Sequence, residues 1–240
     1  MSTLMRRALT GALPVALLLG AAPAAAQVPT VQQVYDRFAE AVGGRQAWAS
    51  ITGRTEKGTA EITFAGISGS LERHQDAPNK MRMIIDLGMV RIDQGFDGTK
   101  GWVDQGQGAQ RMPATMEKGL AESNTGGTNF LDPSRYQKAA VEAKDTFDGK
   151  DAWRVAITTK AGEESVEYFE VATGLRIGTV SKSPMGEQKV TYREYLTVDG
   201  KKLPSKIVQA TPQGDVVLNI TSVTFGAPDA ALFKAPETIK

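Results

Sequence analysis

Short segments in which apolar and polar residues alternate fill most of the chain after residue 52. Such alternation is typical of β-strands that bury one face. Glycine-containing turns separate the segments, and the Asp-Gly pairs at Asp97, Asp148 and Asp199 favour tight hairpins. An antiparallel sheet of so many short strands has to curl, so the pattern predicts a mainly β fold that forms a barrel or half-barrel. The predicted strands span residues 59–64, 67–73, 81–87, 89–96, 101–103, 140–147, 152–159, 165–171, 175–181, 187–198, 203–210 and 216–225.

One amphipathic helix is predicted in front of the strands. Between residues 30 and 42, apolar side chains recur three and four positions apart and form a single stripe. Thr30 and Gln33 match the capping box of a helix N-terminus, and the pair Gly43-Gly44 favours a C-terminal stop. A short second turn follows and is expected to fold back on this helix, which adds an α component to the β fold.

The segment from residue 105 to residue 137 interrupts the strands. Pro113 favours the start of a helix that runs to about residue 122, because proline is tolerated in the first helical turn. A polar, glycine-containing stretch at residues 123–129 follows and is the best candidate for a moving loop. We interpret this segment as a helical excursion within one domain that spans residues 27–240.

The first 26 residues have the pattern of a secretory signal peptide. Arg6 and Arg7 precede an apolar run of small residues, and the sequence Ala24-Ala25-Ala26 is typical of a cleavage site. The apolar run is shorter than the roughly 20 residues that a transmembrane helix needs. The sequence therefore predicts a periplasmic or secreted protein that is cleaved near Ala26 and keeps no membrane span.

Composition excludes several classes of site. The chain has no cysteine and one histidine, which rules out disulfides, thiol nucleophiles, iron–sulfur clusters and sites that need two imidazoles. The formal net charge of +1 argues against nucleic-acid binding, which requires a basic surface. No calcium-binding loop or phosphate-binding loop is present. We expect no metal and no cofactor.

Candidate catalytic groups are few. His74 is expected at an exposed turn, and no Gly-x-Ser-x-Gly motif accompanies it. Glu163, Glu164 and Glu167 could form paired carboxylates, but acidic residues on an exposed strand face are the commoner cause of such a pattern. The sequence therefore predicts a non-catalytic protein.

Methionines and other large apolar residues cluster in the first half of the chain. Methionine is flexible and polarisable, so it is frequent where a surface accepts varied apolar ligands. The same residues could equally fill an ordinary core. The candidates for lining a lipid-binding cavity are Phe64, Met81, Met83, Ile85, Met89, Trp102, Met116 and Leu120.

Four short motifs occur in a fixed order along the chain. They are Val42-Gly43-Gly44-Arg45-Gln46-Ala47-Trp48, Phe96-Asp97-Gly98-Thr99-Lys100-Gly101-Trp102, Val198-Asp199-Gly200-Lys201-Lys202-Leu203-Pro204-Ser205-Lys206-Ile207 and Phe233-Lys234-Ala235-Pro236. Together they resemble the LolA/LolB-like superfamily of bacterial outer-membrane lipoprotein-sorting proteins, and the resemblance covers nearly all of the chain after the signal peptide.

This resemblance implies an unclosed antiparallel β-barrel whose helices form a lid over a hydrophobic cavity. It also implies a periplasmic carrier or binding protein for a lipid or for the acyl chains of a lipoprotein. The alternative is an envelope sensor, or a module that binds a protein partner, on the same scaffold. A large exposed apolar patch would favour that alternative.

Overall fold

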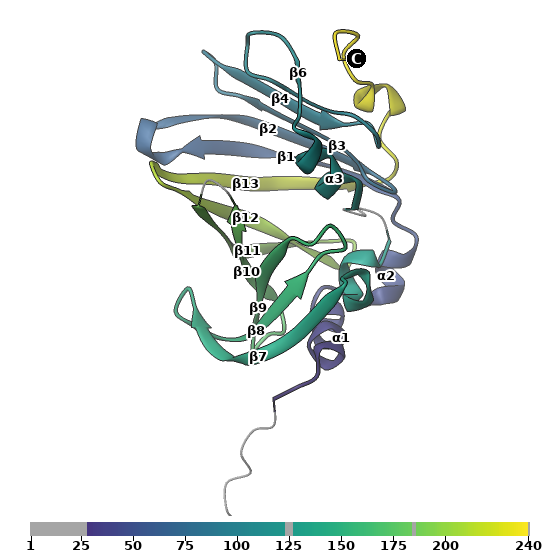
Figure 1. Cartoon of the computed structure of the whole chain (residues 1–240), viewed down its shortest axis with the longest axis vertical. Coiled ribbons are helices and arrows are strands. Elements are labelled where there is room, and N and C mark those ends of the chain that lie inside the picture. Colours follow the sequence, from purple (N-terminus) through teal and green to yellow (C-terminus); the bar gives the residue numbers. More distant parts are fainter. Residues whose placement is uncertain (1–27, 123–126, 184–185, 240) are drawn as a thin grey trace, which may run out of the picture.

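The computed structural model describes residues 28–122, 127–183 and 186–239 (Figure 1). The predicted signal peptide and residues 123–126 of the predicted mobile loop lie outside the described residues. The helices are α1 (Val31–Ala41), α2 (Arg45–Ala49) and α3 (Ala114–Glu122), and the 3-10 turns are η1 (Thr63–Ala65), η2 (Asn129–Leu131), η3 (Pro133–Arg135) and η4 (Ala230–Phe233).

The strands form one antiparallel sheet of 13 strands in the order β6-β5-β4-β3-β2-β1-β13-β12-β11-β10-β9-β8-β7. They are β1 (Gly53–Ile62), β2 (Ile67–Asp76), β3 (Lys80–Asp86), β4 (Arg91–Phe96), β5 (Gly101–Asp104), β6 (Gln110–Arg111), β7 (Lys138–Phe147), β8 (Lys150–Thr158), β9 (Glu164–Glu170), β10 (Arg176–Ser183), β11 (Gly186–Val198), β12 (Lys201–Thr211) and β13 (Gly214–Phe225).

The sheet consists of two meanders that are joined by the pairing of β1 with β13. The strands β6 and β7 lie at opposite ends of the strand order, so the sheet curls but does not close (Figure 1). The helix α3 and the turns η2 and η3 lie in the connection between these two edges. The predicted mainly β, unclosed antiparallel barrel is confirmed.

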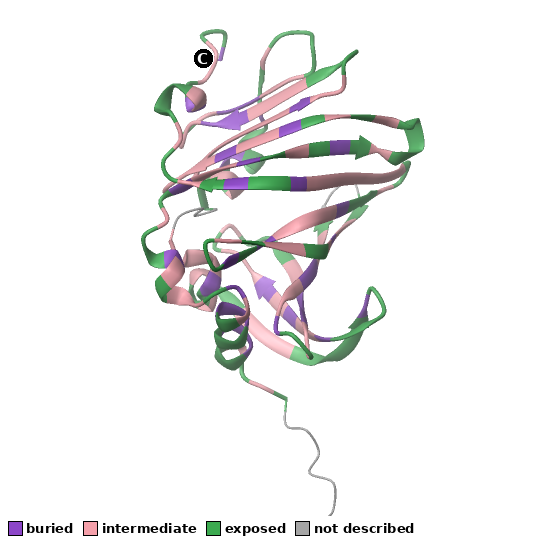
Figure 2. Ribbon diagram, turned by 180° about the vertical axis from the view of Figure 1, so that it is seen from behind, coloured by how far each residue is buried: buried purple, intermediate pink, exposed green. Residues whose placement is uncertain are grey.

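The N-terminal helix forms as its sequence predicts. Thr30 Oγ1 accepts a hydrogen bond from the Gln33 amide at 3.2 Å, and Gln33 Oε1 accepts one from the Thr30 amide at 2.8 Å. The side of α1 that faces the sheet buries Val34, Tyr35 and Phe38, and the opposite side is exposed (Figure 2). The helix α1 therefore covers part of the concave face of the sheet.

The main core lies between the concave face and these helices. It combines residues of α1 and α2 with inward residues from both meanders, such as Leu71, Ile85, Val155 and Phe169. The convex face has its own cover, because η4 packs on β3 and Arg82 Nη1 donates a hydrogen bond to the Leu232 carbonyl at 3.1 Å. The two faces are thus buried by different segments of the chain.

Three strand predictions differ from the structure. The strand β1 begins at Gly53, several residues before the predicted start, because its inward positions include the buried Glu56 and do not have an apolar pattern. The strand β6 has only two residues and was not predicted. Met89 was expected within a strand but lies in the turn between β3 and β4, where it is 86% exposed.

Gly95 of β4 lies directly opposite Trp102 of β5, and this pair allows a test of the packing on the convex face. A Cβ atom at Gly95 would overlap the buried ring of Trp102. We therefore expect Gly95→Ala to lower the free energy of unfolding by about 1–3 kcal/mol, as overpacked cores do. Urea denaturation measures this difference.

Gly119→Ala is the matched control, because a Cβ atom at Gly119 meets only ordinary contacts near Glu163 at 3.6 Å. Alanine is also favoured over glycine inside a helix such as α3. The expected result is unchanged or slightly raised stability. Equal destabilisation by the two substitutions would contradict the proposed packing of Trp102.

Candidate ligand site on the concave face

A pocket of about 200 Å³ lies between the helices and the concave face, and we call it the central pocket. Its apolar wall comes from the N-terminal helices, from η2 and from β12. Its polar residues come from the strands β1, β2, β10, β11 and β12. The lining residues are Phe38, Val42, Trp48, Arg54, Gln75, Phe130, Arg176, Tyr195, Lys202, Leu203 and Pro204.

Aromatic contacts hold the cover of the central pocket together. The ring of Phe130 packs edge-on against Trp48 at 4.9 Å between centroids and against Phe38 at 6.1 Å. Trp48 also meets Phe225 of β13 at 5.7 Å. Its indole Nε1 donates a hydrogen bond to the Val42 carbonyl at 3.1 Å. These contacts place α1, α2 and η2 in one layer above the sheet.

One buried carboxylate ties this layer to the sheet. Glu167 of β9 is 2% exposed and accepts hydrogen bonds from the hydroxyl groups of Tyr35 and Tyr136, the latter at 3.1 Å. Arg176 Nη1 donates to the same carboxylate at 2.7 Å, and Arg135 Nη2 lies 3.8 Å from it. We call this set the Glu167 cluster; it holds two guanidinium groups and one carboxylate.

A second buried carboxylate lies on the neighbouring part of the concave face. Glu56 of β1 is also 2% exposed. Arg54 Nε donates to its Oε1 at 2.7 Å, and Arg73 Nε donates to its Oε2 at 2.7 Å. This Glu56 cluster has the same composition of charge as the Glu167 cluster. The concave interior therefore holds charged groups beside its apolar residues.

The positive neighbours decide the protonation of both carboxylates. Burial acts to raise the pKa of Glu167, but the charges of Arg176 and Arg135 outweigh it, so the pKa is lowered. Burial likewise opposes ionisation of Glu56, and Arg73 with Arg54 lowers its pKa. Burial, together with the charge of Glu167, raises the pKa of Tyr35. Tyr35 consequently stays protonated and donates its hydrogen bond to an ionised carboxylate.

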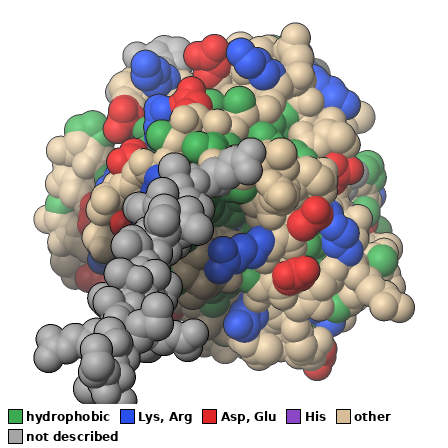
Figure 3. Space-filling model, turned by 90° about the horizontal axis from the view of Figure 1, so that it is seen from below, with side chains coloured by type: hydrophobic (Ala, Val, Ile, Leu, Met, Phe, Trp, Pro, Cys, Tyr) green, Lys and Arg blue, Asp and Glu red, His purple; other side chains and the backbone are tan. Residues whose placement is uncertain are grey.

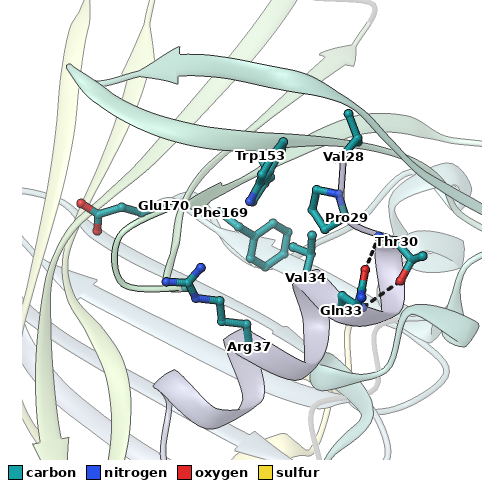
Figure 4. A pocket seen from close by; sticks show the side chains of 10 residues that line it. Val28, Pro29, Thr30, Gln33, Val34, Arg37, Trp153, Phe169 and Glu170 are labelled. Atoms are coloured by element: carbon teal, nitrogen blue, oxygen red, sulfur yellow. Dashed lines mark hydrogen bonds between the residues drawn. The ribbon is translucent and has the colours of Figure 1, made fainter. Parts of the chain in front are cut away.

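A second opening, of about 480 Å³, lies at the N-terminal end of α1 (Figure 4). Val34, Trp153 and Phe169 form its apolar wall, and Arg37 of α1 and Glu170 of β9 also line it. On the face seen from below, acidic and basic side chains alternate with small apolar areas (Figure 3). The lining of this opening therefore combines apolar side chains with a basic and an acidic side chain.

The structure separates the predicted cavity residues into groups. Met81, Met83 and Ile85 of β3 share the face that bears Leu71, which belongs to the concave core. Trp102 is buried beside Gly95 on the opposite face. Three of the remaining candidates, Phe64, Met89 and Met116, are exposed. Leu120 is half-buried.

Sequence reasoning was wrong about two polar side chains. His74 was expected at an exposed turn but is 4% exposed within β2, with Nδ1 3.0 Å from Thr55 Oγ1. Glu167 was expected on an exposed strand face and is instead the centre of a buried cluster. The signal that could have found Glu167 is its position between Val166 and Tyr168, where period-two alternation allows either face to be buried.

In the described part of the chain, no three His, Asp or Glu side chains gather into a metal-binding group. None of the helices in the described residues has the length and hydrophobicity of a membrane span.

The Glu167 cluster generates a stability prediction. Glu167→Gln leaves the charges of Arg135 and Arg176 buried without a carboxylate, so we expect a loss of about 3–5 kcal/mol in the free energy of unfolding near neutral pH. Because the folded pKa of Glu167 is lowered, its contribution is present above the pKa of an unfolded glutamate and is lost as the pH falls through the folded pKa. The difference between the two proteins should therefore stay nearly constant down to about pH 4 and shrink below it.

Urea denaturation at several pH values measures this difference. The control is Glu61→Gln, which removes an exposed carboxylate from the same kind of strand and should cost less than about 0.5 kcal/mol. A loss that is the same for the two substitutions at every pH would refute the role of the cluster.

No protein-family model matches the sequence, and no curated protein matches it either. Solved structures do match. A DUF1329 family protein from Desulfovibrio piger superposes with a TM-score of 0.56 at 14% identity, over 84% of this chain and 96% of its own. A LolA superfamily protein from Nitrosomonas europaea superposes with a TM-score of 0.56 at 13% identity, over 86% and 98%.

A domain from Vibrio parahaemolyticus that is assigned to the outer membrane lipoprotein-sorting proteins superposes with a TM-score of 0.52 at 11% identity, over 82% of this chain and 97% of its own. At such identities the likeness concerns the fold, which these proteins share along nearly their whole length. The resemblance predicted from the sequence is confirmed at this level: the chain has the fold of the LolA superfamily proteins.

Proposed function

We propose that the mature protein is a non-catalytic periplasmic carrier that binds a lipid, or the acyl chains of a lipoprotein, between its helices and the concave face of its sheet. The observation that carries this proposal is the unclosed concave face, which separate helices cover through side-chain contacts. The fold shared with a LolA superfamily protein and with a lipoprotein-sorting domain supports it.

The energetics of such a carrier need no catalytic group. Burial of one methylene contributes about 0.8 kcal/mol, so a chain of roughly fourteen carbons offers about 11 kcal/mol before ordering costs. The central pocket, at about 200 Å³, is smaller than the roughly 300–1,000 Å³ of typical ligand sites. Binding of a whole acyl chain therefore requires α1, α2 and η2 to move away from the sheet.

The cover is suited to such movement. The helix α2 has only five residues, and η2 has three. Gly127, which follows the undescribed part of the connection, donates a backbone hydrogen bond to the Ile51 carbonyl at 2.6 Å. The Lys202 amide of β12 likewise donates to the Val42 carbonyl at 3.0 Å. Elements that are held by so few backbone hydrogen bonds open at a lower free-energy cost than strands within a sheet.

Among the predicted cavity residues, Met81, Met83 and Ile85 are the ones that we propose as ligand contacts. They continue the apolar concave surface from β3 toward the helices, and Met83 packs against the main core. A ligand that separates the helices from the sheet would replace these contacts with its own acyl chain.

The direct test is native mass spectrometry of the mature protein purified from its own periplasm, followed by lipid extraction. We expect a co-purifying lipid or acylated species. A clean apo mass, together with no uptake of a fluorescent fatty acid, would overturn the carrier proposal and favour the sensor or partner-binding alternative.

A pair of substitutions tests where the ligand lies. Met83→Trp fills space on the concave face, so we expect the affinity for a fluorescent fatty acid to fall about tenfold, which corresponds to about 1.4 kcal/mol. Met89→Trp is the control. Met89 lies in an exposed turn, so this substitution should leave the affinity for the fatty acid unchanged. Thermal unfolding verifies that both variants fold. The reverse pattern would place the ligand at the turn.

A further inference from the structure

We propose that the central pocket recognises the anionic head group of an amphiphile, a carboxylate or a phosphate, through the guanidinium groups of Arg54 and Arg176. This inference rests on the proposed function, and it adds the chemical class of the ligand. An apolar tail would then lie against the aromatic cover, and the head group would lie against the strands.

The charge balance around the central pocket is the first observation. The Glu56 cluster and the Glu167 cluster together hold four guanidinium groups and two carboxylates. One arginine of each cluster, Arg54 and Arg176, also lines the pocket. The four arginine side chains are only 17–22% exposed, and a surplus of positive charge in such a partly buried site attracts an anion.

The hydrogen bonds of these two arginines are the second observation. Arg54 donates from Nε to Glu56, while its terminal nitrogens donate to no described residue. Arg176 donates from Nη1 to Glu167, but its buried Nε has no acceptor among the described residues. Buried donors in folded proteins are nearly always satisfied. Both arginines thus retain donor capacity after they have neutralised their own carboxylates.

A third polar group at the pocket is incompletely bonded. The Gln75 Oε1 atom is buried and has no donor among the described residues. A carboxamide can present either its oxygen or its NH₂ group, so Gln75 can donate to an anion or accept from a protonated phosphate. Gln75 lines the same pocket as Arg54 and Arg176.

The rest of the pocket is built for the other end of an amphiphile. Phe38, Trp48 and Phe130 form an apolar wall opposite these polar groups. The guanidinium of Arg176 is itself stacked against apolar surface, 5.8 Å from the ring centroid of Phe38 and 5.2 Å from that of Tyr192. A low-polarity environment strengthens the attraction between a guanidinium and an anion.

The opening at the N-terminal end of α1 lacks this arrangement. One arginine, Arg37, lines it and already donates to the Ala172 carbonyl at 3.0 Å, while Glu170 of the same lining pairs with Lys150 at 3.3 Å. Two arginines that retain donors line the central pocket, so we assign the head group to that pocket.

The experiment measures the binding of three amphiphiles with the same sixteen-carbon tail to the delipidated mature protein: hexadecanoate, hexadecyl phosphate and hexadecanol. Displacement of a fluorescent fatty acid gives each affinity. We expect at least one of the two anions to bind about tenfold to hundredfold more tightly than the neutral alcohol. A preference for hexadecanoate indicates a fatty carboxylate, and a preference for hexadecyl phosphate indicates a phospholipid head group.

Arg54→Met should lower the affinity for the anions far more than the affinity for hexadecanol and so remove most of this preference; thermal unfolding verifies that the variant folds. Arg54→Lys should retain part of it. The control is Arg154→Met, because Arg154 pairs with Glu142 outside the central pocket and is not one of its lining residues.

Three results would overturn the inference, and they distinguish it from the carrier function. Equal affinities for all three amphiphiles, or a preference that survives in Arg54→Met, would reject head-group recognition and leave the carrier function standing. Failure of all three amphiphiles to bind would reject the carrier function and the head-group proposal with it.

Discussion

The concave face of this sheet has to be covered by something other than the sheet itself. Its two edges are β6, with two residues, and β7, with ten, and a helical connection lies between them. Edge-to-edge closure would require matched strands. The apolar residues on the inner face therefore depend on α1, α2 and η2 for burial. These elements contribute Val34, Tyr35, Phe38, Ala39, Trp48 and Leu131 to the main core.

Charged and polar side chains also hold the helices against the sheet. Tyr35 of α1, Tyr136 and Arg176 of β10 meet at Glu167, so one carboxylate links the N-terminal helix, the segment before β7 and the sheet. Removal of a single partner from such a network is costly, whereas an apolar replacement of the whole network can be neutral. The network therefore specifies where the helix docks, and the aromatic contacts around it add the free energy of apolar burial.

Much of the fold could be predicted from the sequence. Alternation and Asp-Gly turns identified nearly all strands, and the capping box located α1 to within a residue. Prediction failed where a charged residue points inward. The first half of β1 was missed because Glu56 interrupts the apolar alternation. Glu167 and His74 were assigned to exposed positions, although each is buried. Hydropathy patterns assign charged residues to solvent, and only a partner brought in from a distant strand or helix reverses that assignment.

The sequence by itself determined the local elements and the fold class, because helix caps, turns and alternation depend on residues that are close together along the chain. The tertiary structure alone decided which apolar residues face the concave side. Sequence proximity grouped Met83, Met89 and Trp102, yet the register of β3, β4 and β5 places them on the inner face, in a turn and on the outer face. The tertiary structure also brings Arg54 and Arg176 to one pocket, because the pairing of strands that are far apart in sequence sets which side chains meet.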